Sequence, residues 1–210
     1  MLEPLDYVRL PARYVLFEPG QPVKQLYFPA SGVVSFVQVD ERGAMPEIAL
    51  VGCEGLVGLS ALLGTERARE RARVQIPGDA YRVPLAAARR AFAQSAAFQA
   101  LALRFADTMI AQLSQNVICK LHHSVEQQFC QRLLWYADHV PNGALEMTHE
   151  QIAEALGARR QGITESARKL QAEQVIAYSR GRISLLNRAA LERRACACYR
   201  VLRANAMTPP

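Results

Sequence analysis

The sequence predicts an α+β protein in which a strand-rich N-terminal part is followed by one long helix and then by a helical C-terminal part. Eight of the twelve glycines and eight of the eleven prolines lie in residues 1–84, where they separate short β-branched and aromatic runs. The rest of the chain is rich in Ala, Leu, Gln and Arg, a composition that favours helices. Neither Gly nor Pro occurs from about residue 96 to residue 122, so this stretch predicts a single uninterrupted helix.

The N-terminal part carries the pattern of a small antiparallel β-domain. Residues 27–28, 33–39 and 47–51 are apolar runs, and residues 40–43 (Asp-Glu-Arg-Gly) carry a hairpin signal. Four glycines in residues 52–64 gather where a loop could bring backbone N–H groups close to an anionic ligand. Tight corners between strands would require the same glycines, so both interpretations stay open.

The long helix predicted over residues 96–122 has apolar residues on more than one face. A helix with two apolar stripes needs two surfaces to cover them. One is the β-domain of its own chain, and we infer that the other is the same helix of a second subunit. A fully buried core helix is the alternative. The residues predicted for the dimer helix are Phe105, Met109, Ile110, Leu113 and Val117.

A short helix that ends in a sharp turn is predicted to begin at Thr148. Thr148 and Gln151 have the spacing of a capping box, in which two side-chain oxygens accept hydrogen bonds from backbone N–H groups at the start of a helix. Ile152 and Leu156 then form an apolar stripe. Gly157 follows where a helix ends in a left-handed residue, a conformation that costs other residues about 1–2 kcal/mol.

A second helix is predicted from about Arg159 to Gln174, with Ile163 and Leu170 facing the first helix. Its opposite face is polar and basic near the N-terminus. Two helices joined by a tight glycine turn match the geometry that places side chains in the major groove of DNA. Arg pairs with guanine and Gln with adenine through bidentate hydrogen bonds. The predicted base-reading residues are Arg160 and Gln161, and those that read or position are Arg159, Thr164 and Arg168.

Two strands are predicted over residues 175–179 and 182–186, around Arg180-Gly181. This hairpin is a wing that would bring Arg180 and Arg182 to the phosphates or the minor groove. An ordinary helical pair with a solvated basic hairpin would share some of these features. The capping box, turn glycine, polar face and basic hairpin in this order favour a winged helix-turn-helix.

The charge distribution agrees with a nucleic-acid partner. Residues 141–210 hold 11 Lys plus Arg and 6 Asp plus Glu, whereas residues 1–140 hold 14 and 13. Most of the net charge of +6 therefore lies with the predicted DNA-reading part, as binding to phosphate requires. The sequence has no apolar run of about 18 residues and no basic leader followed by a short apolar segment. We therefore expect a cytoplasmic protein without a membrane partner.

The cysteines and histidines do not predict a metal site. Cys196 and Cys198 are expected on one C-terminal helix, pointing in different directions as buried small hydrophobes, with a thiol sensor as the alternative. His122 and His123 are adjacent and point about 100° apart on a helix. The odd number of cysteines and their spacing predict reduced thiols. The five cysteines are Cys53, Cys119, Cys130, Cys196 and Cys198.

Two further helices are expected over residues 125–139 and 187–203, and Pro141-Asn142-Gly143 is the clearest linker signal of the chain. We divide the chain into residues 1–122, the β-domain with the long helix, and residues 123–210, the DNA-binding domain.

Four segments resemble one subgroup of a known family in the same order: residues 26–35 (LYFPASGVVS), 51–59 (VGCEGLVGL), 123–127 (HSVEQ) and 178–183 (YSRGRI). With the helix-turn-helix, they make the chain similar to the Crp/Fnr family of bacterial transcription regulators over about residues 10–203. The resemblance implies an N-terminal effector-sensing β-roll (a cyclic-nucleotide-binding-like jelly roll), a long dimerisation helix and a C-terminal winged helix-turn-helix. It also implies a homodimer that binds a palindromic operator under effector control, with RNA polymerase as a partner.

The sequence departs from the family pattern in the effector region. In the cyclic AMP receptor protein a Glu in a Gly-Glu turn holds the ribose and an Arg-Ser pair holds the cyclic phosphate. The matching turn here is Gly58-Leu59, and Glu70 falls where the phosphate arginine would be. A carboxylate there would repel an anion, so cyclic AMP is not expected unless a shift of one residue brings Arg71 into play. The residues indicated for an effector pocket are Gly52, Glu54, Gly58, Leu59, Arg69 and Arg71.

Two more departures concern the cofactor and the operator. The iron–sulfur members of the family use cysteines near the N-terminus, whereas this chain has none before Cys53, so no such cluster is expected. Arg160 matches the family's first base-reading arginine. Gln161 stands where many members have Glu, and Glu165 stands where the receptor protein has a second Arg. The operator sequence should differ accordingly.

Two alternatives to an effector-controlled regulator remain open from the sequence. One is a constitutive DNA-binding dimer in which the β-roll is a scaffold that senses nothing. The other is a cupin-like metalloenzyme, which would need His and carboxylate ligands clustered in the β-domain. The four histidines, at positions 122, 123, 139 and 149, all lie outside it. We therefore predict no catalytic residues.

Overall fold

The computed structural model describes residues 5–39, 41, 43–140 and 144–205. These residues form two compact units. The N-terminal unit contains the described residues from Leu5 to Val37 and from Ala49 to Ala111, and the C-terminal unit those from Gln38 to Ile48 and from Gln112 to Asn205. The predicted linker at 141–143 lies outside the described residues, as do Asp40 and Arg42 of the predicted hairpin turn.

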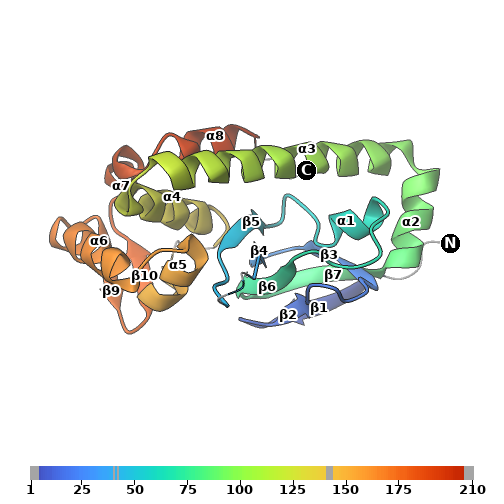
Figure 1. The fold of residues 1–210 in the computed structure, drawn as a ribbon, viewed down its shortest axis with the longest axis horizontal. Coiled ribbons are helices and arrows are strands. Elements are labelled where there is room, and N and C mark those ends of the chain that lie inside the picture. Colours follow the sequence, from blue (N-terminus) through green and yellow to red (C-terminus); the bar gives the residue numbers. More distant parts are fainter. Residues whose placement is uncertain (1–4, 40, 42, 141–143, 206–210) are drawn as a thin grey trace. The chain divides into compact units, whose positions relative to one another are not determined.

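The strands of the N-terminal unit form two antiparallel sheets (Figure 1). One has the order β1-β7-β3 and the other the order β2-β6-β4-β5. Every residue of β4 is buried, and Ala72 and Val74 of β6 alternate with more exposed neighbours. The β-rich N-terminal part is therefore confirmed. The strands are β1 (Asp6–Leu10), β2 (Val15–Phe17), β3 (Gln25–Pro29), β4 (Val33–Val37), β5 (Glu47–Val51), β6 (Arg71–Ile76) and β7 (Gly78–Pro84).

Three helices accompany these sheets: α1 (Leu59–Leu62), α2 (Leu85–Gln94) and α3 (Ala96–His122). The bounds of α3 match the long helix predicted from the sequence. The backbone N–H of Phe98 donates to Ser95 Oγ over 3.2 Å, and this bond caps the start of α3. Helix α3 is continuous and passes from the N-terminal unit into the C-terminal unit after Ala111.

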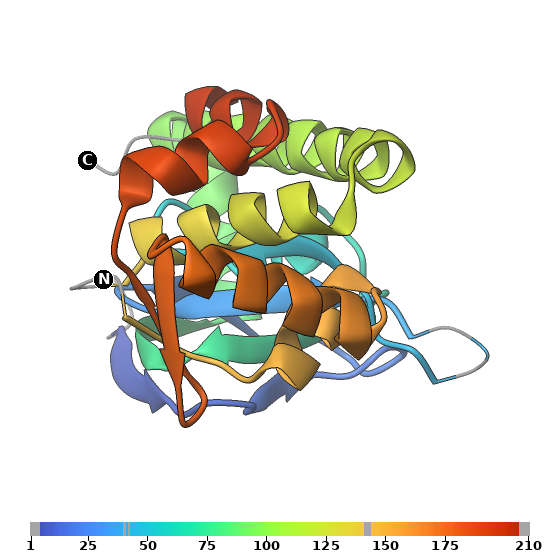
Figure 2. The same cartoon turned by 90° about the vertical axis from the view of Figure 1, so that its left-hand side faces the viewer.

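The C-terminal unit combines five helices with a three-stranded sheet among the described residues. Helix α4 is its centre, because Phe129, Leu133 and Tyr136 are fully buried. Figure 2 shows α6 in front of the unit, with the long β9–β10 hairpin beside it. The elements are α4 (Val125–Asp138), β8 (Ala144–Glu146), α5 (His149–Leu156), α6 (Arg160–Ala172), β9 (Ile176–Ser179), β10 (Arg182–Leu185), α7 (Arg188–Arg194) and α8 (Cys198–Asn205).

The C-terminal unit differs from the prediction in two places. Strand β8 was not predicted, and it pairs with β10 in a sheet of order β8-β10-β9. The single helix predicted over residues 187–203 is two helices, because Ala195 adopts an extended conformation (φ −67°, ψ 149°) and ends α7. The prediction that Cys196 and Cys198 lie on one helix is therefore wrong, since Cys196 lies in the break.

The segment from Gln38 to Ile48 joins the C-terminal unit through a buried polar cluster. Glu47 forms an ion pair with Arg132 of α4, and both side chains are almost fully buried. Tyr136 donates from its hydroxyl to Glu47 Oε2 over 3.1 Å. Burial lowers the pKa of Arg132, and the neighbouring carboxylate compensates its charge. The side-chain amide of Asn116 adds a 2.8 Å hydrogen bond to Ile48 O.

Among the residues that the structure describes, no helix combines the length and the apolar character needed to span a membrane.

Candidate nucleic-acid interface and effector region

The first helix of the predicted DNA-reading pair, α5, has the caps that its sequence predicts. Thr148 Oγ1 accepts from the backbone N–H of Gln151 over 3.2 Å, and the Gln151 side chain accepts from the backbone N–H of Thr148 over 2.7 Å. Gly157 at its end is left-handed (φ 56°, ψ 33°). The N–H of Ala158 then donates to Ala153 O over 2.9 Å, which satisfies a terminal carbonyl and turns the chain toward α6.

Helix α6 buries one face and exposes the other. Ile163, Ala167 and Leu170 are at most 1% exposed, so they hold the helix on the unit. The chain leaves α6 through Gln174, which has a positive φ of 55°. The helix therefore ends at Ala172, two residues before the predicted end. Four of the residues that are predicted to read DNA bases or to position the helix are exposed on its outer face: Arg159, Arg160, Gln161 and Arg168.

The exposed residues at the start of α6 carry local acidic partners. Arg160 Nε lies 3.3 Å from a carboxylate oxygen of Glu150, and both side chains are about two-thirds exposed (70% and 66%). The amide of Gln161 donates to Glu165 Oε1 over 2.9 Å. Exposed pairs of this kind contribute about 0–1 kcal/mol, so both side chains can exchange their partners for DNA bases at low cost.

His149 is a residue of this region that sequence reasoning missed. Its ring stacks on Tyr178 of β9, with centroids 4.0 Å apart and planes 24° apart. Its Nδ1 lies 3.3 Å from Thr164 Oγ1, so His149 contacts one of the residues that are predicted to read bases or to position the helix. Burial, with the positive charges of Arg160 and Arg168 as smaller causes, lowers the pKa of His149. Thr164 also donates to Arg160 O over 3.0 Å.

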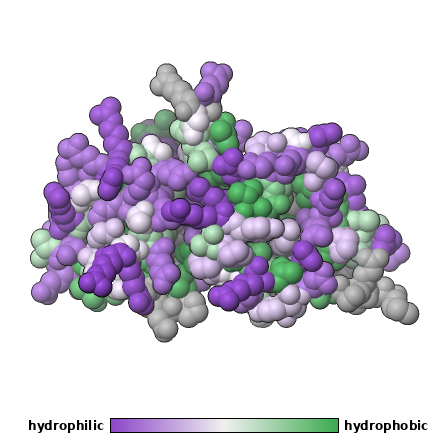
Figure 3. All heavy atoms as spheres, turned by 90° about the horizontal axis from the view of Figure 1, so that it is seen from below, coloured by the Kyte–Doolittle hydropathy of each residue, from purple (hydrophilic) through white to green (hydrophobic). Residues whose placement is uncertain are grey.

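The β9–β10 hairpin is the wing that the sequence predicts. Ser179 and Arg182 pair across the two strands, which leaves Arg180 and Gly181 as a two-residue loop. Both have positive φ values, 49° and 76°, as a type I′ turn requires. Arg180 and Arg182 are exposed. On the face of the C-terminal unit that Figure 3 shows, hydrophilic side chains predominate.

Ion pairs fix the elements behind this surface to one another. Glu126 of α4 pairs with Lys169 of α6 over 2.9 Å and with Arg194 of α7 over 3.3 Å. Arg194 also pairs with Glu173, which follows α6. These contacts connect three helices of the C-terminal unit, and they add to the buried face of α6 in holding that helix in the unit.

The residues predicted for the effector pocket occupy several elements of the N-terminal unit. Gly58 is the left-handed N-cap of α1 (φ 99°), and Leu59 begins that helix. Glu54 accepts from the backbone N–H of Gly52 over 3.0 Å. The guanidinium of Arg71 is paired with Glu18 over 2.7 Å. Arg69 is exposed.

Glu70 beside Arg71 is partly buried, and burial raises the pKa of its carboxyl. Arg71 already has a carboxylate partner in Glu18. Because Arg71 is already paired with one carboxylate and a second carboxyl group, that of Glu70, is its chain neighbour, the geometry does not favour a cyclic phosphate here.

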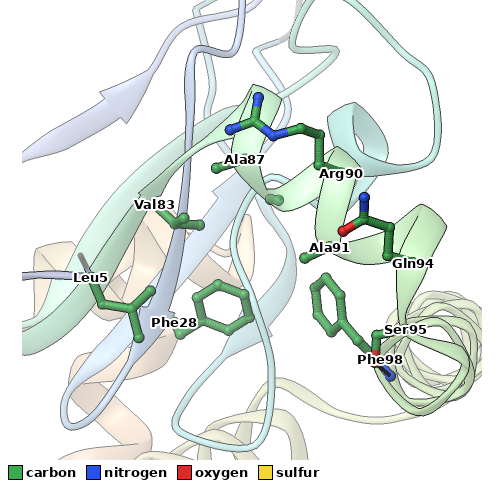
Figure 4. A pocket seen from close by; sticks show the side chains of 10 residues that line it. Leu5, Phe28, Val83, Ala87, Arg90, Ala91, Gln94, Ser95 and Phe98 are labelled. Atoms are coloured by element: carbon green, nitrogen blue, oxygen red, sulfur yellow. Dashed lines mark hydrogen bonds between the residues drawn. The ribbon is translucent and has the colours of Figure 1, made fainter. Parts of the chain in front are cut away.

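A separate apolar cavity of about 360 Å³ lies among β3, β7, α2 and the start of α3 (Figure 4). Phe28 and Phe98 form part of its wall, with ring centroids 6.3 Å apart. Small alanine side chains of α2 create the space, and the alanines of that helix are the sequence signal from which the cavity could have been predicted. The lining residues are Leu5, Phe28, Val83, Ala87, Ala88, Arg90, Ala91, Gln94, Ser95 and Phe98.

The residues predicted for the dimer helix divide between two environments. Phe105 is only 4% exposed, and its ring approaches Gly55 so closely that a Cβ there would lie 2.2 Å from it. Met109 is half-buried. The other three predicted residues, Ile110, Leu113 and Val117, are exposed. They form a row of exposed apolar side chains on α3 together with Leu103 and Leu121.

Two family descriptions match the two parts of the chain. Residues 7–95 match the cyclic nucleotide-binding domain, and residues 127–194 match the Crp-like helix-turn-helix domain. The chain is 24% identical over 197 residues to the global nitrogen regulator of Synechococcus elongatus, which covers 90% of this chain and 89% of that protein.

Solved structures show the same fold. A transcriptional regulator of the CRP/FNR family from Thermus thermophilus has a TM-score of 0.74 and 23% identity, covering 90% of this chain and 98% of that chain. FixK2 from Bradyrhizobium japonicum has a TM-score of 0.76 and 14% identity, covering 93% and 99%.

A winged helix-turn-helix and an effector-binding β-domain on one chain define a DNA-binding transcription regulator. The chain belongs to the Crp/Fnr family of such regulators. The fold and the family are those of regulators of transcription rather than of enzymes.

Proposed function

We propose that the protein is a homodimer that reads a specific palindromic DNA sequence, with α6 of each subunit in a major groove. The observation that carries this proposal is the first turn of α6. Arg160 and Gln161 project from a helix whose opposite face is fixed in the core. Their side-chain types read guanine and adenine. Arg159, Thr164 and Arg168 read neighbouring bases or position the helix.

The wing has a different role in this proposal. Arg180 and Arg182 lie at or beside a two-residue turn, where a guanidinium can reach a phosphate or the minor groove. Contacts with phosphate add affinity that is the same for all sequences and that decreases with salt. The base preference then comes from α6 alone.

The dimer is proposed from the exposed row on α3. Leu103, Ile110 and Val117 are spaced seven residues apart, and they are 51%, 63% and 58% exposed. Leu113 occupies the position between the last two. A seven-residue repeat with an intervening apolar residue is the pattern of a two-helix seam. We therefore assign the seam to these residues, with Met109 at its edge and Phe105 packed within its own subunit.

The effector is proposed to bind in the N-terminal unit, and the structure offers two places for it. The first place is the loop of residues 52–59 together with Arg69 and Arg71. The apolar cavity among β3, β7 and α2 is the other, and its volume of about 360 Å³ lies in the range of small-molecule sites. The Arg71–Glu18 pair favours the second place, and with it a largely apolar effector rather than cyclic AMP. Proposed in the same way are a cytoplasmic location and a contact with RNA polymerase.

Selection of bound sequences from a random pool of duplex DNA tests the function directly. The 210-residue chain should enrich a two-fold symmetric sequence whose half-sites are about 10 base pairs apart, one helical turn. A matched variant with Arg160→Ala should lose the preference at one base of each half-site and keep the symmetry. Absence of any enriched sequence at moderate salt would contradict the proposal, and an enriched single half-site would contradict the dimer.

A paired titration tests the effector sites. A true effector shifts the thermal midpoint because it binds the folded state and not the unfolded one. It also shifts the operator affinity, because it binds the DNA-bound and the free protein with different affinity. Ala91→Leu narrows the apolar cavity, whereas Ala86→Leu on the exposed side of α2 serves as its control. If Arg71→Ala alone abolishes the response, the loop site is the correct one. If no ligand changes either quantity, the β-roll is a scaffold.

A further inference from the structure

We infer that Cys119, His123, Cys196 and Cys198 form a binding site for zinc inside the C-terminal unit. One potential ligand atom from each side chain lies within 4.8 Å of all the others. The three cysteines are buried and the histidine is partly buried. Three thiolates and one imidazole are an established ligand set of closed, four-coordinate structural zinc sites.

The distances between the ligand atoms fit a single ion. Zn–S bonds of about 2.3 Å at tetrahedral angles place two sulfurs about 3.8 Å apart, and a sulfur and an imidazole nitrogen about 3.6 Å apart. Cys119 Sγ and Cys196 Sγ are 3.6 Å apart, and Cys198 Sγ and His123 Nδ1 are 3.4 Å apart. Small rotations of the side chains would therefore complete the coordination.

Two short backbone features bring the four side chains together. Cys119 and His123 are four residues apart at the end of α3, so they share one face of the helix. The backbone N–H of His123 donates to Cys119 O over 3.2 Å, which continues that turn. Cys196 lies in the break between α7 and α8, and Cys198 begins α8. The break turns both sulfurs to the same point, which one continuous helix would not do.

Gln115 provides a polar contact around this site. Its side-chain amide donates to Cys198 Sγ over 3.0 Å, and it lies on α3 one turn before Cys119. Metal-binding side chains are usually oriented by such hydrogen bonds, and an N–H donor stabilises the negative charge of a thiolate. The contact therefore orients Cys198 Sγ toward the other three groups and would stabilise its negative charge once a metal ion is bound.

The chemistry of the ligand set selects zinc. Thiolates favour soft or borderline cations. Binding would release one proton from each cysteine that is a thiol beforehand, and His123 would coordinate through Nδ1 while its Nε2 carries the proton. A disulfide would account for Cys119 and Cys196 but not for the two other groups that converge on them. An iron–sulfur cluster places its ligands around a cage of several irons, which requires wider spacing than the four atoms have here.

Metal analysis of the 210-residue chain tests the site. The reduced protein is dialysed against Zn²⁺, then against metal-free buffer, and its zinc content is measured by mass spectrometry. One zinc per chain is expected, and a strong chelator should lower the thermal midpoint because the ion binds only the folded state. Replacement by Co²⁺ should give the intense ligand-field bands of a tetrahedral, thiolate-bound ion. A chain that keeps no zinc, or that contains iron with sulfide, would overturn the inference.

Five variants make the test specific. Cys196→Ser should abolish retention of zinc, whereas Cys130→Ser, at a buried cysteine of α4 outside the site, and Cys53→Ser, at an exposed one, should keep it. His123→Gln affects a partly exposed side chain, so the fold should survive while the cobalt spectrum changes. Gln115→Leu should weaken zinc binding by about 10-fold or more. Equal zinc content in Cys196→Ser and Cys130→Ser would refute the site, even if DNA selection succeeds.

Discussion

Two polar regions of the C-terminal unit differ in solvent exposure: one is exposed and the other is buried. The start of α6 presents Arg160 and Gln161 to solvent, each with an exposed acidic partner. The cluster of Glu47, Arg132 and Tyr136 is buried instead. Exposed pairs contribute little to stability and remain available to a ligand. Buried pairs cannot be broken on one side without leaving a charge in an apolar interior. One region should therefore control DNA recognition, and the other should control folding.

The largest effect is expected from Glu47→Ala. It leaves the guanidinium of Arg132 buried without its partner, which costs about 3–5 kcal/mol of stability in comparable cases. Urea unfolding measures this cost, and the exposed Glu41→Ala in the same segment should change little. The operator sequence selected by the folded fraction should stay the same. A loss of stability no larger than that of Glu41→Ala would mean that the cluster does not hold this segment.

The second prediction concerns the exposed region. Arg160→Ala should reduce discrimination at one base pair of each half-site by about 1–3 kcal/mol, because a bidentate contact to guanine is lost. The free energy of unfolding should change little, since the side chain is 70% exposed. Affinity measurements on a set of operator variants test this prediction.

Arg182→Ala provides the contrast on the wing. It should weaken binding to all of these operators alike and reduce the salt slope by about one. If the two variants affect the operators in the same way, the division of roles between α6 and the wing is wrong.

The third prediction concerns the turn that separates α5 from α6. Gly157 has a φ of 56°, and a Cβ there would lie 3.4 Å from Pro46. Gly157→Ala should therefore cost about 1–2 kcal/mol of stability, the usual cost of a left-handed residue. Gly162→Ala is the control, because that glycine is helical and an added Cβ would make an ordinary 3.5 Å contact with Val125. It should be neutral or stabilise by up to about 1 kcal/mol. Equal effects of the two variants would show that the turn does not need a glycine.

The reading segment could be predicted from the sequence because its signals are local. The box of Thr148 and Gln151, the left-handed Gly157 and the hairpin at Arg180-Gly181 each depend on residues fewer than five positions apart. Helix α3 was predicted with its observed bounds for the same reason, since no Gly or Pro interrupts it. Local hydrogen bonds and backbone preferences are sufficient to specify such elements.

Contacts between distant residues could not be predicted in this way. Glu47 meets Tyr136 across 89 positions, and Cys119 meets Cys196 across 77. Strand β8 is short, and its pairing with β10 is decided by the sheet and not by its three residues. The break between α7 and α8 at Ala195 contains no Gly or Pro that would have predicted it. These features depend on packing, which a single sequence does not display.

The smallest effect on stability is expected from the protonation of His149. The exposure of this side chain is intermediate between those of the two polar regions. Burial lowers the pKa of this imidazole from its ordinary value of 6.5, so the folded state binds its proton less readily than the unfolded state does. Stability should therefore decrease as the pH falls below 6.5 toward the pKa of the folded state, and His149→Gln should remove that part of the decrease. His122→Gln, at an exposed histidine of α3, is the control. Thermal midpoints between pH 5 and pH 8 measure both variants, and a pH dependence that His149→Gln leaves intact would show that this ring does not sense the proton.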